Sequence, residues 1–312
     1  MSLAPAAGRD RVLVAGAAGF LGRAIVADFA AHGWQVRGLV RDDRRAIPVA
    51  AAGGEPVFAD VLDADAVERA ADGCRAVVHV AANPTVDPAG SDAARRVRVE
   101  GCRNLIAAAR ATGAARVVVG SGYWVYADQA GDFDENGRLD PRGESAVNFD
   151  TEQVAREAVA PPAVMVVRPG MVYGDGSWFR GIVDALRADT YRVIDEGRNP
   201  WSFVALADAA AGFRTVVEAG RPGAVYNLVD LRPAPWGEFV AHVAARIGAA
   251  PPGSMTRAEA QQQFGEAIAH HLAARRAASS ALLRSLGWVP RYPSYRLGVD
   301  ALLTAMGFDG GL

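Results

Sequence analysis

Three glycines near the start of the chain have the spacing of a phosphate-binding turn. Gly16, Gly19 and Gly22 follow a short apolar run and open a helical pattern. These glycines permit a tight turn, a close backbone approach to an anion, and close helix–strand packing, while the helix start offers free N–H groups. The pattern predicts a pyrophosphate site, and a turn that serves packing alone is the alternative. The residues expected to bind are Gly16, Ala18, Gly19, Phe20 and Leu21.

The next apolar run ends in charged residues that bear on the choice of dinucleotide. An acidic side chain at this point suits the ribose 2′-hydroxyl of NAD, whereas Arg suits the 2′-phosphate of NADP. Arg41 comes first, Arg44 and Arg45 follow, and Asp42 is the opposing residue. We therefore expect NADP(H) in preference to NAD(H), and a solvated charged loop is the alternative.

Short apolar runs alternate with amphipathic stretches in the first half of the chain. The runs lack polar alternation, as is typical of strands buried on both faces of a parallel sheet, and they are 12–15, 36–40, 56–59, 76–80, 116–120 and 164–167. Helical patterns cover 20–32, 65–72 and 92–112. This order predicts an α/β fold with a doubly wound parallel Rossmann sheet.

The second half of the chain has helical patterns and only one further strand, at 224–228. The helices are expected at 177–188, 207–218, 236–247, 257–276 and 295–306. We expect a disordered N-terminus over 1–10, a dinucleotide-binding domain over 11–170 with returning segments from 203–230, and a smaller, mainly helical cap over 171–312. Ligands of such sheets bind beyond the carboxyl ends of the strands, under the cap.

Composition excludes several other classes of protein. The chain has 312 residues, 51% of them hydrophobic, and a net charge of −2, which gives no electrostatic case for nucleic acid. Two Cys without metal-ligand spacing argue against a zinc site or a disulfide framework, so we expect no metal. No apolar run approaches a membrane span and no signal pattern precedes the first strand, so a cytoplasmic protein is expected.

Several motifs in the right order give the chain a resemblance to the extended short-chain dehydrogenase/reductase superfamily, in its NAD-dependent epimerase/dehydratase group. The motifs are Gly16-x-x-Gly19-x-x-Gly22, Asp60-Val61, Val78–Ala82, Val125–Ala127 and Arg168–Gly174. The resemblance implies that Asp60 and Val61 contact adenine and that Ala81, Ala82, Pro169 and Val172 lie beside the cofactor. By analogy with such folds, a homodimer is a hypothesis.

The residues that carry the chemistry of this family are replaced. The resemblance implies a Tyr as general acid or base, a Lys four residues later that lowers its pKa, and a Ser or Thr on the reacting oxygen. These positions fall on Phe149, Gln153 and Gly122, and a further familial Asn falls on Arg98. The sequence contains no Lys, so no other alignment restores the pair. Gln153 can still bind ribose hydroxyls, but ordinary carbonyl–alcohol redox should be slowed by at least about 10²–10⁴-fold.

The segment after the fifth strand contains tyrosines that could replace the missing general acid. Tyr123 or Tyr126 could act as a displaced acid, with Arg98 supplying positive charge, and rings that only wall the pocket are the alternative. The resemblance implies that sugar-nucleotide epimerases bind the sugar diphosphate through an Arg just before the cap segment. In this chain the equivalent stretch, 199–203, has an aromatic residue in place of that Arg, which favours a small, fairly hydrophobic ligand. The residues expected on the substrate side are Asn83, Arg98, Trp124, Trp178, Arg180 and Trp201.

Three functions are compatible with this pattern. The first is an NADP(H)-dependent enzyme that acts on a small non-sugar carbonyl or hydroxyl compound through non-standard residues. The second is a non-catalytic NADP(H) sensor or binding scaffold. The third is a sugar-nucleotide epimerase, which Phe149, Gln153 and Trp201 together oppose.

Overall fold

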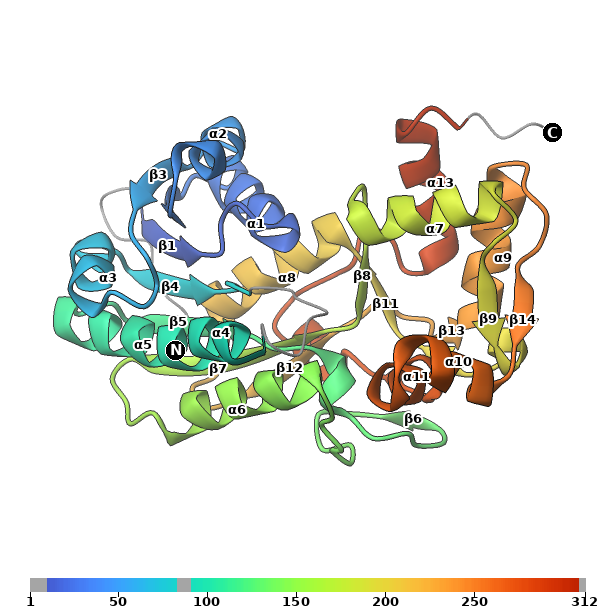
Figure 1. Ribbon diagram of the computed structural model, residues 1–312. Coiled ribbons are helices and arrows are strands. Elements are labelled where there is room, and N and C mark those ends of the chain that lie inside the picture. The colour runs from blue at the N-terminus through green and yellow to red at the C-terminus, as the bar shows by residue number, and fades with distance from the viewer. Residues whose placement is uncertain (1–9, 83–90, 309–312) are drawn as a thin grey trace.

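The computed structural model describes residues 10–82 and 91–308, which are built around a seven-stranded parallel sheet (Figure 1). The strand order is β12-β7-β5-β4-β1-β2-β3. The strands are β1 (Arg11–Ala15), β2 (Gln35–Val40), β3 (Glu55–Phe58), β4 (Ala76–His79), β5 (Arg116–Gly120), β7 (Ala163–Pro169) and β12 (Val225–Leu228). The predicted doubly wound parallel α/β sheet is confirmed. All of the expected disordered N-terminus except Asp10 lies outside the described residues.

Apolar side chains on both faces of the strands build two cores. In β1, Val12 and Val14 enter one core, while Leu13 and Ala15 enter the other. The first core is covered by α1 (Phe20–Ala31), α2 (Asp43–Ala51) and α8 (Leu206–Ala219). The second is covered by α3 (Ala64–Ala71), α5 (Gly101–Thr112) and α6 (Glu144–Glu157). Burial on both faces explains why the strand sequences lack polar alternation.

Several helices differ from the pattern read in the sequence. The apolar spacing predicted neither α2 nor α6. The predicted helix over 92–112 is divided into α4 (Ser91–Arg95), a π-helical turn η2 (Arg96–Glu100) and α5. The predicted helix over 257–276 breaks at Gly265, whose φ of 83° leaves α10 (Arg257–Phe264) and α11 (Glu266–Ala273). A positive φ is inexpensive only for glycine, so this residue ends the first helix.

The cap packs around an aromatic core beyond one end of the sheet (Figure 1). It contains α7 (Ser177–Arg187), α9 (Trp236–Arg246), α10, α11 and α13 (Tyr295–Ala305), with α12 (Ala281–Arg284) beside β12. Paired short strands are β8 (Met171–Tyr173) with β11 (Phe203–Ala205), β9 (Arg192–Ile194) with β14 (Gly253–Met255), β10 (Pro200–Trp201) with β13 (Ala234–Pro235), and β6 (Asp132–Phe133) with β15 (Ala277–Ala278). The predicted strand at 224–228 is β12, the edge strand of the main sheet.

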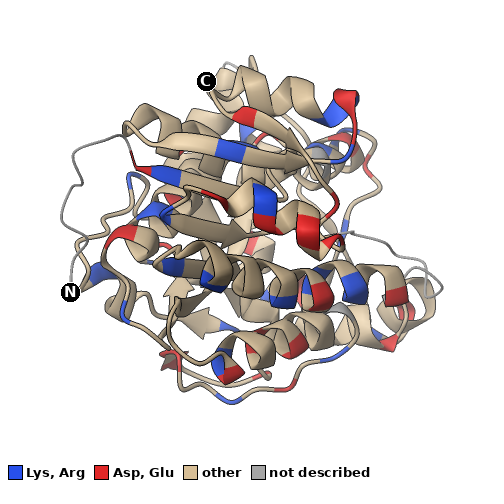
Figure 2. Ribbon diagram, turned by 90° about the vertical axis from the view of Figure 1, so that its left-hand side faces the viewer, with Lys and Arg blue, Asp and Glu red and all other residues tan. Residues whose placement is uncertain are grey.

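Charges of both signs are interspersed over the helices in Figure 2, in keeping with a net charge of −2. Both cysteines, Cys74 and Cys102, are buried and free. Within the described ranges no helix has the length and apolar character needed to cross a membrane.

Candidate functional site

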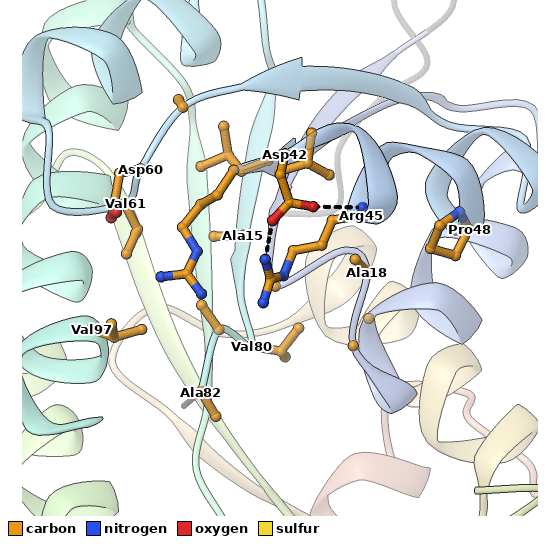
Figure 3. Close-up of a pocket in the computed structure, with 18 of the residues that line it drawn as sticks. Ala15, Ala18, Asp42, Arg45, Pro48, Asp60, Val61, Val80, Ala82 and Val97 are labelled. Atoms are coloured by element: carbon orange, nitrogen blue, oxygen red, sulfur yellow. Dashed lines mark hydrogen bonds and ion pairs between the residues drawn. The ribbon is translucent and has the colours of Figure 1, made fainter. Parts of the chain in front are cut away.

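A cleft of about 730 Å³ opens where β1, β2, β3 and β4 end (Figure 3). Its wall comes from the turns after these strands, with Val97 of the π-helical turn η2 closing one side. The lining residues are Ala15, Gly16, Ala18, Gly19, Phe20, Leu21, Gly22, Leu39, Val40, Arg41, Asp42, Arg44, Arg45, Pro48, Ala59, Asp60, Val61, Val80, Ala81, Ala82 and Val97. The sheet topology therefore brings segments from the first hundred residues into one elongated cavity.

The glycine turn forms the floor of this cleft. Gly16 has a φ of 90°, and a Cβ atom there would lie 2.5 Å from the backbone nitrogen of Ala81. Only glycine fits such a position. Gly19 is the N-cap of α1, and α1 has neither a side-chain cap nor an acidic residue in its first turn. Its first N–H groups and positive dipole end are thus left for an anion.

The far end of the cleft carries three arginines and one carboxylate. Asp42 caps α2: one of its oxygens accepts a hydrogen bond from the Arg45 backbone nitrogen at 2.9 Å, and the other pairs with the Arg45 guanidinium (Figure 3). The backbone hydrogen bond from Arg45 is the main cause that lowers the pKa of Asp42. Arg41 and Arg44 also line the cleft, and neither forms an ion pair with a residue in the described part of the chain. This end therefore offers more unpaired positive than negative charge.

The expected reaction centre lies at the end of β5, next to β4. Gly122 is buried with no side chain to offer, Phe149 packs against the rings of Tyr123 and Tyr126, and Gln153 is exposed on α6. Both tyrosines are fully buried, and burial raises the pKa of both hydroxyls, that of Tyr126 to about 12. Neither ring lines the cleft. A proton donor must reach the reacting atom, and the role of either tyrosine as a displaced general acid stays a prediction.

A buried polar network lies beneath this segment. Glu152 of α6 accepts hydrogen bonds from Arg168 Nε at 2.8 Å, from Arg168 Nη2 at 2.6 Å and from Ser121 Oγ at 2.5 Å. Arg168 Nη1 donates to the Tyr126 hydroxyl at 2.8 Å, which donates to Asn227 Oδ1 at 2.7 Å. Glu152 and Arg168 have no exposed surface. This network holds the backbone after β5 in place, and the charges of Glu152 and Arg168 are paired with each other.

The aromatic residues expected around the substrate are placed differently from one another. Trp124 is half-buried, whereas Trp201 is fully buried, stacks on Trp236 at 4.3 Å between ring centroids and donates from Nε1 to Ala274 O. Trp178 donates to Val172 O at 3.0 Å, and Arg180 is bound to Asp175. The substrate role of Trp201 thus has no support in the geometry, because its ring is part of the cap core.

Arg98 and His79 are also positioned by backbone contacts. Arg98 is half-buried on η2, and its carbonyl oxygen lies 2.9 Å from His79 Nε2. Burial lowers the pKa of His79 to about 4, so the ring is neutral at physiological pH. Across the residues described, no cluster of three His, Cys, Asp or Glu side chains could hold a metal ion. Asn83 lies outside the described residues.

Comparison with known proteins identifies the chain. Residues 12–228 match the NAD dependent epimerase/dehydratase family. The chain belongs to this family. The family resemblance predicted from the sequence motifs is thus confirmed.

Named relatives of this family member include reductases. A 3-diazoavenalumate denitrifying reductase from a Streptomyces species is 35% identical over 305 residues, which cover 93% of this chain and 99% of that protein. The 4-hydroxy-2-methyl-3-oxo-4-farnesyl-3,4-dihydroquinoline-1-oxide ketoreductase of Stigmatella aurantiaca is 31% identical over 72% of this chain and 69% of that protein. A human epimerase family protein solved with NADPH has a TM-score of 0.80 at 20% identity, over 94% of this chain and 99% of that chain.

Most of the predicted cofactor residues of this family member lie in the cleft. Those that line it are Gly16, Ala18, Gly19, Phe20, Leu21, Arg41, Asp60, Val61, Ala81 and Ala82, whereas Gln153, Pro169 and Val172 do not. Their cofactor role stays a prediction. The prediction missed Pro48 and Val97, because each enters the cleft from a helical segment that carries no phosphate or ribose motif.

Proposed function

We propose that this protein is an NADP(H)-dependent reductase of a small non-sugar compound, and that its acceptor takes hydride without receiving a proton from the protein. Family membership and the reductase names of relatives covering most of the chain support the reaction class. The observation that carries the proposal is the pairing of an open dinucleotide cleft with a reaction end that has no free acid among the residues described.

The residues that line the cleft suit the adenosine and pyrophosphate parts of a dinucleotide. The uncapped start of α1 would hold the pyrophosphate, with Gly19 leaving room for its oxygens. Asp60 and Val61 would lie against the adenine end. Bound in its reduced form, the cofactor supplies hydride.

The pairing of the charged residues in the cleft favours the 2′-phosphate form of the cofactor. Asp42 would be the partner for a free ribose 2′-hydroxyl, but its oxygens are taken by the cap of α2 and by Arg45. Arg41 and Arg44 face the cleft with unpaired guanidinium groups among the described contacts. Arg binds phosphate through charge-assisted hydrogen bonds, so NADP(H) should bind more tightly than NAD(H).

The acceptor side limits the chemistry. Reduction of a ketone needs hydride on carbon and a proton on oxygen, and here Phe149 and Gln153 stand where a phenol and an ammonium are expected. An aryl diazonium needs only hydride: a carbon–hydrogen bond forms from the hydride pair, the carbon–nitrogen pair leaves with N₂, and no proton is consumed. The 35% identical relative is named as a denitrifying reductase of a diazo compound. We therefore infer a diazo-bearing aromatic acceptor.

The side chains of this protein would then bind the acceptor and shield it from water, and they would not exchange protons with it. The aromatic side chains near the end of β5 and in the cap would cover a flat acceptor and exclude water. The buried Glu152–Arg168 pair would hold the β5 end rigid.

The test uses purified protein, NADPH deuterated at C4 and two acceptor classes. With benzenediazonium-4-carboxylate we expect loss of absorbance at 340 nm, release of N₂ and deuterium in the benzoate formed. With 4-carboxybenzaldehyde and 4-acetylbenzoate we expect rates at least about 10²-fold lower. Gly19→Asp is the matched control for uncatalysed reduction, because the new carboxylate caps α1 and occupies the anion seat.

Other outcomes separate the competing functions. Fast carbonyl reduction with an inert diazonium would overturn the acid-free mechanism. Tight NADPH binding without hydride transfer to either class would indicate a sensor or scaffold. Turnover of a nucleotide sugar would indicate an epimerase. The homodimer stays a prediction that sedimentation of the same sample decides.

A further inference from the structure

An amide side chain stands next to the bare backbone at the end of β5. A Cβ atom built on Gly122 would lie 3.4 Å from Asn148 Nδ2 and 4.0 Å from Trp124 Cδ1. Gly122 has a φ of −170° and a ψ of 151°, which is extended backbone open to any residue. Glycine is therefore not required here by backbone conformation. Its effect is to leave a gap of about the size of a methyl group between an amide and an indole.

Asn148 is a partly accessible polar group of this neighbourhood that remains uncommitted. It lies one helical turn before Glu152 on α6, so both side chains face the β5 end. Glu152 is saturated by Arg168 and Ser121. The Asn148 side chain makes no hydrogen bond to any residue in the described ranges, and it is half-buried and thus partly accessible. A buried-side donor with no partner is available to a ligand.

The other border of the gap is held rigidly. The Trp124 ring meets Trp201 at 5.4 Å and His271 at 5.2 Å between centroids, both edge to face. The Arg276 guanidinium lies 5.6 Å from the centre of the Trp124 ring. Since Trp201, His271 and Arg276 are buried, the indole cannot swing away into the cap. It offers a fixed apolar surface at the same gap.

We propose that Asn148 is a substrate-contacting residue that donates a hydrogen bond to the acceptor, while Trp124 supports its flat ring. The ligand class is a planar aromatic compound that carries a hydrogen-bond acceptor group such as a carboxylate. This inference rests on the proposed function, because Gly122 stands where the family resemblance expects the residue that contacts the reacting oxygen. An amide donates a hydrogen bond without releasing its proton, so it orients and polarises an acceptor that needs no acid.

The experiment compares three variants with a control on the same helix. Asn148→Leu removes the donor at similar volume, Asn148→Asp keeps the shape but only accepts, and Gly122→Ala fills the gap from the other side. Glu157→Gln, on the exposed end of α6, is the control. For each protein we would measure kcat and KM with benzenediazonium-4-carboxylate, the dissociation constant of NADPH, and binding of 4-hydroxycinnamate to the NADP⁺ complex.

We expect both Asn148 variants to lose about 10²-fold in kcat/KM, with kcat falling more than KM rises, and NADPH affinity to stay within about twofold. Gly122→Ala should weaken 4-hydroxycinnamate at least about tenfold without changing NADPH binding, and the control should match the parent protein. Asn148→Leu with unchanged kcat and KM, or with lost NADPH affinity, would overturn the assignment. If the parent protein reduces neither acceptor class, the proposed function fails, and 4-hydroxycinnamate binding alone then decides: equal affinity in parent and Asn148→Leu refutes the role of Asn148.

Discussion

Tyr123 and Tyr126 form a matched pair in which deletion of one oxygen should have opposite effects on stability. Both rings are fully buried beside each other. The Tyr126 hydroxyl accepts from Arg168 Nη1 at 2.8 Å and donates to Asn227 Oδ1 at 2.7 Å. The Tyr123 hydroxyl has no hydrogen-bond partner among the residues described. Replacing each Tyr with Phe therefore removes a satisfied hydroxyl in one case and an unsatisfied one in the other.

The magnitudes follow from these contacts. In Tyr126→Phe, Arg168 Nη1 keeps the carbonyl oxygen of Glu135 at 3.3 Å, but Asn227 Oδ1 loses its donor inside the core. We expect a loss of about 2–3 kcal/mol in the free energy of unfolding, the range for a buried hydrogen bond to a charged partner with one group left unpaired. Tyr123→Phe removes a buried hydroxyl whose desolvation is not compensated, so it should be neutral or stabilise by up to about 1 kcal/mol.

Urea unfolding followed by fluorescence at 25 °C measures both free energies, and NADPH oxidation with the acceptor of the parent protein measures kcat. Both variants should retain kcat within about threefold, because neither hydroxyl reaches the cleft. A Tyr126→Phe protein as stable as Tyr123→Phe would refute the reading of the network. A folded variant that loses more than about 10²-fold in kcat would restore that tyrosine as the displaced acid.

Three further predictions concern the cofactor and the core. Arg41→Ala should weaken NADPH about 10- to 100-fold in a fluorescence titration and leave NADH unchanged; an unaltered preference would make the NADP assignment wrong. Gly19→Asp should abolish NADPH binding by calorimetry, because the new carboxylate takes the place of the anion at the start of α1; retained binding would refute the anion site. Burial raises the pKa of Asp230 to about 8, so between about pH 4 and pH 8 the folded protein holds a proton that the unfolded chain releases. The free energy of unfolding of the parent relative to Asp230→Asn should thus fall as pH rises through that window, by at most about 1.4 kcal/mol per pH unit. An equal difference between the two proteins in urea titrations at pH 5 and at pH 8 would contradict it.

The sheet and the phosphate turn are predictable from sequence because their signals are local. Runs such as 116–120 are apolar on both faces, and Gly16 needs a positive φ that other residues avoid. The helix α2 is not predictable in this way. Its start depends on one capping carboxylate, Asp42, and its interior contains Pro48. The π-helical turn that brings Val97 to the cleft likewise follows from packing, because no residue type in 96–100 marks it.

The position of Trp201 shows why side chains of the cap are harder to predict. Its place in the stretch where the family resemblance expects an Arg that binds the substrate suggested a pocket wall. The ring is instead stacked on Trp236, which is 35 residues later in the chain. The pairing of β10 with β13 sets that contact. Contacts of this kind depend on strand order in small sheets, for which a sequence of two or three residues holds little information.

The polar side chains at the reaction end lie one residue away from the positions of the family's reactive side chains. Ser121, Asn148 and Glu152 each precede by one position the places where the family resemblance expects its reactive side chains, namely Gly122, Phe149 and Gln153. One residue turns a side chain by about 100° on a helix and to the opposite face on a strand. The offset carries the Glu152 carboxylate inward to Arg168 of β7, where it is fully buried and cannot exchange protons with a ligand. The sequence alone shows that the family's phenol and ammonium groups are replaced, but only the packing of α6 against β5 and β7 shows that the Glu152 carboxylate is buried against Arg168.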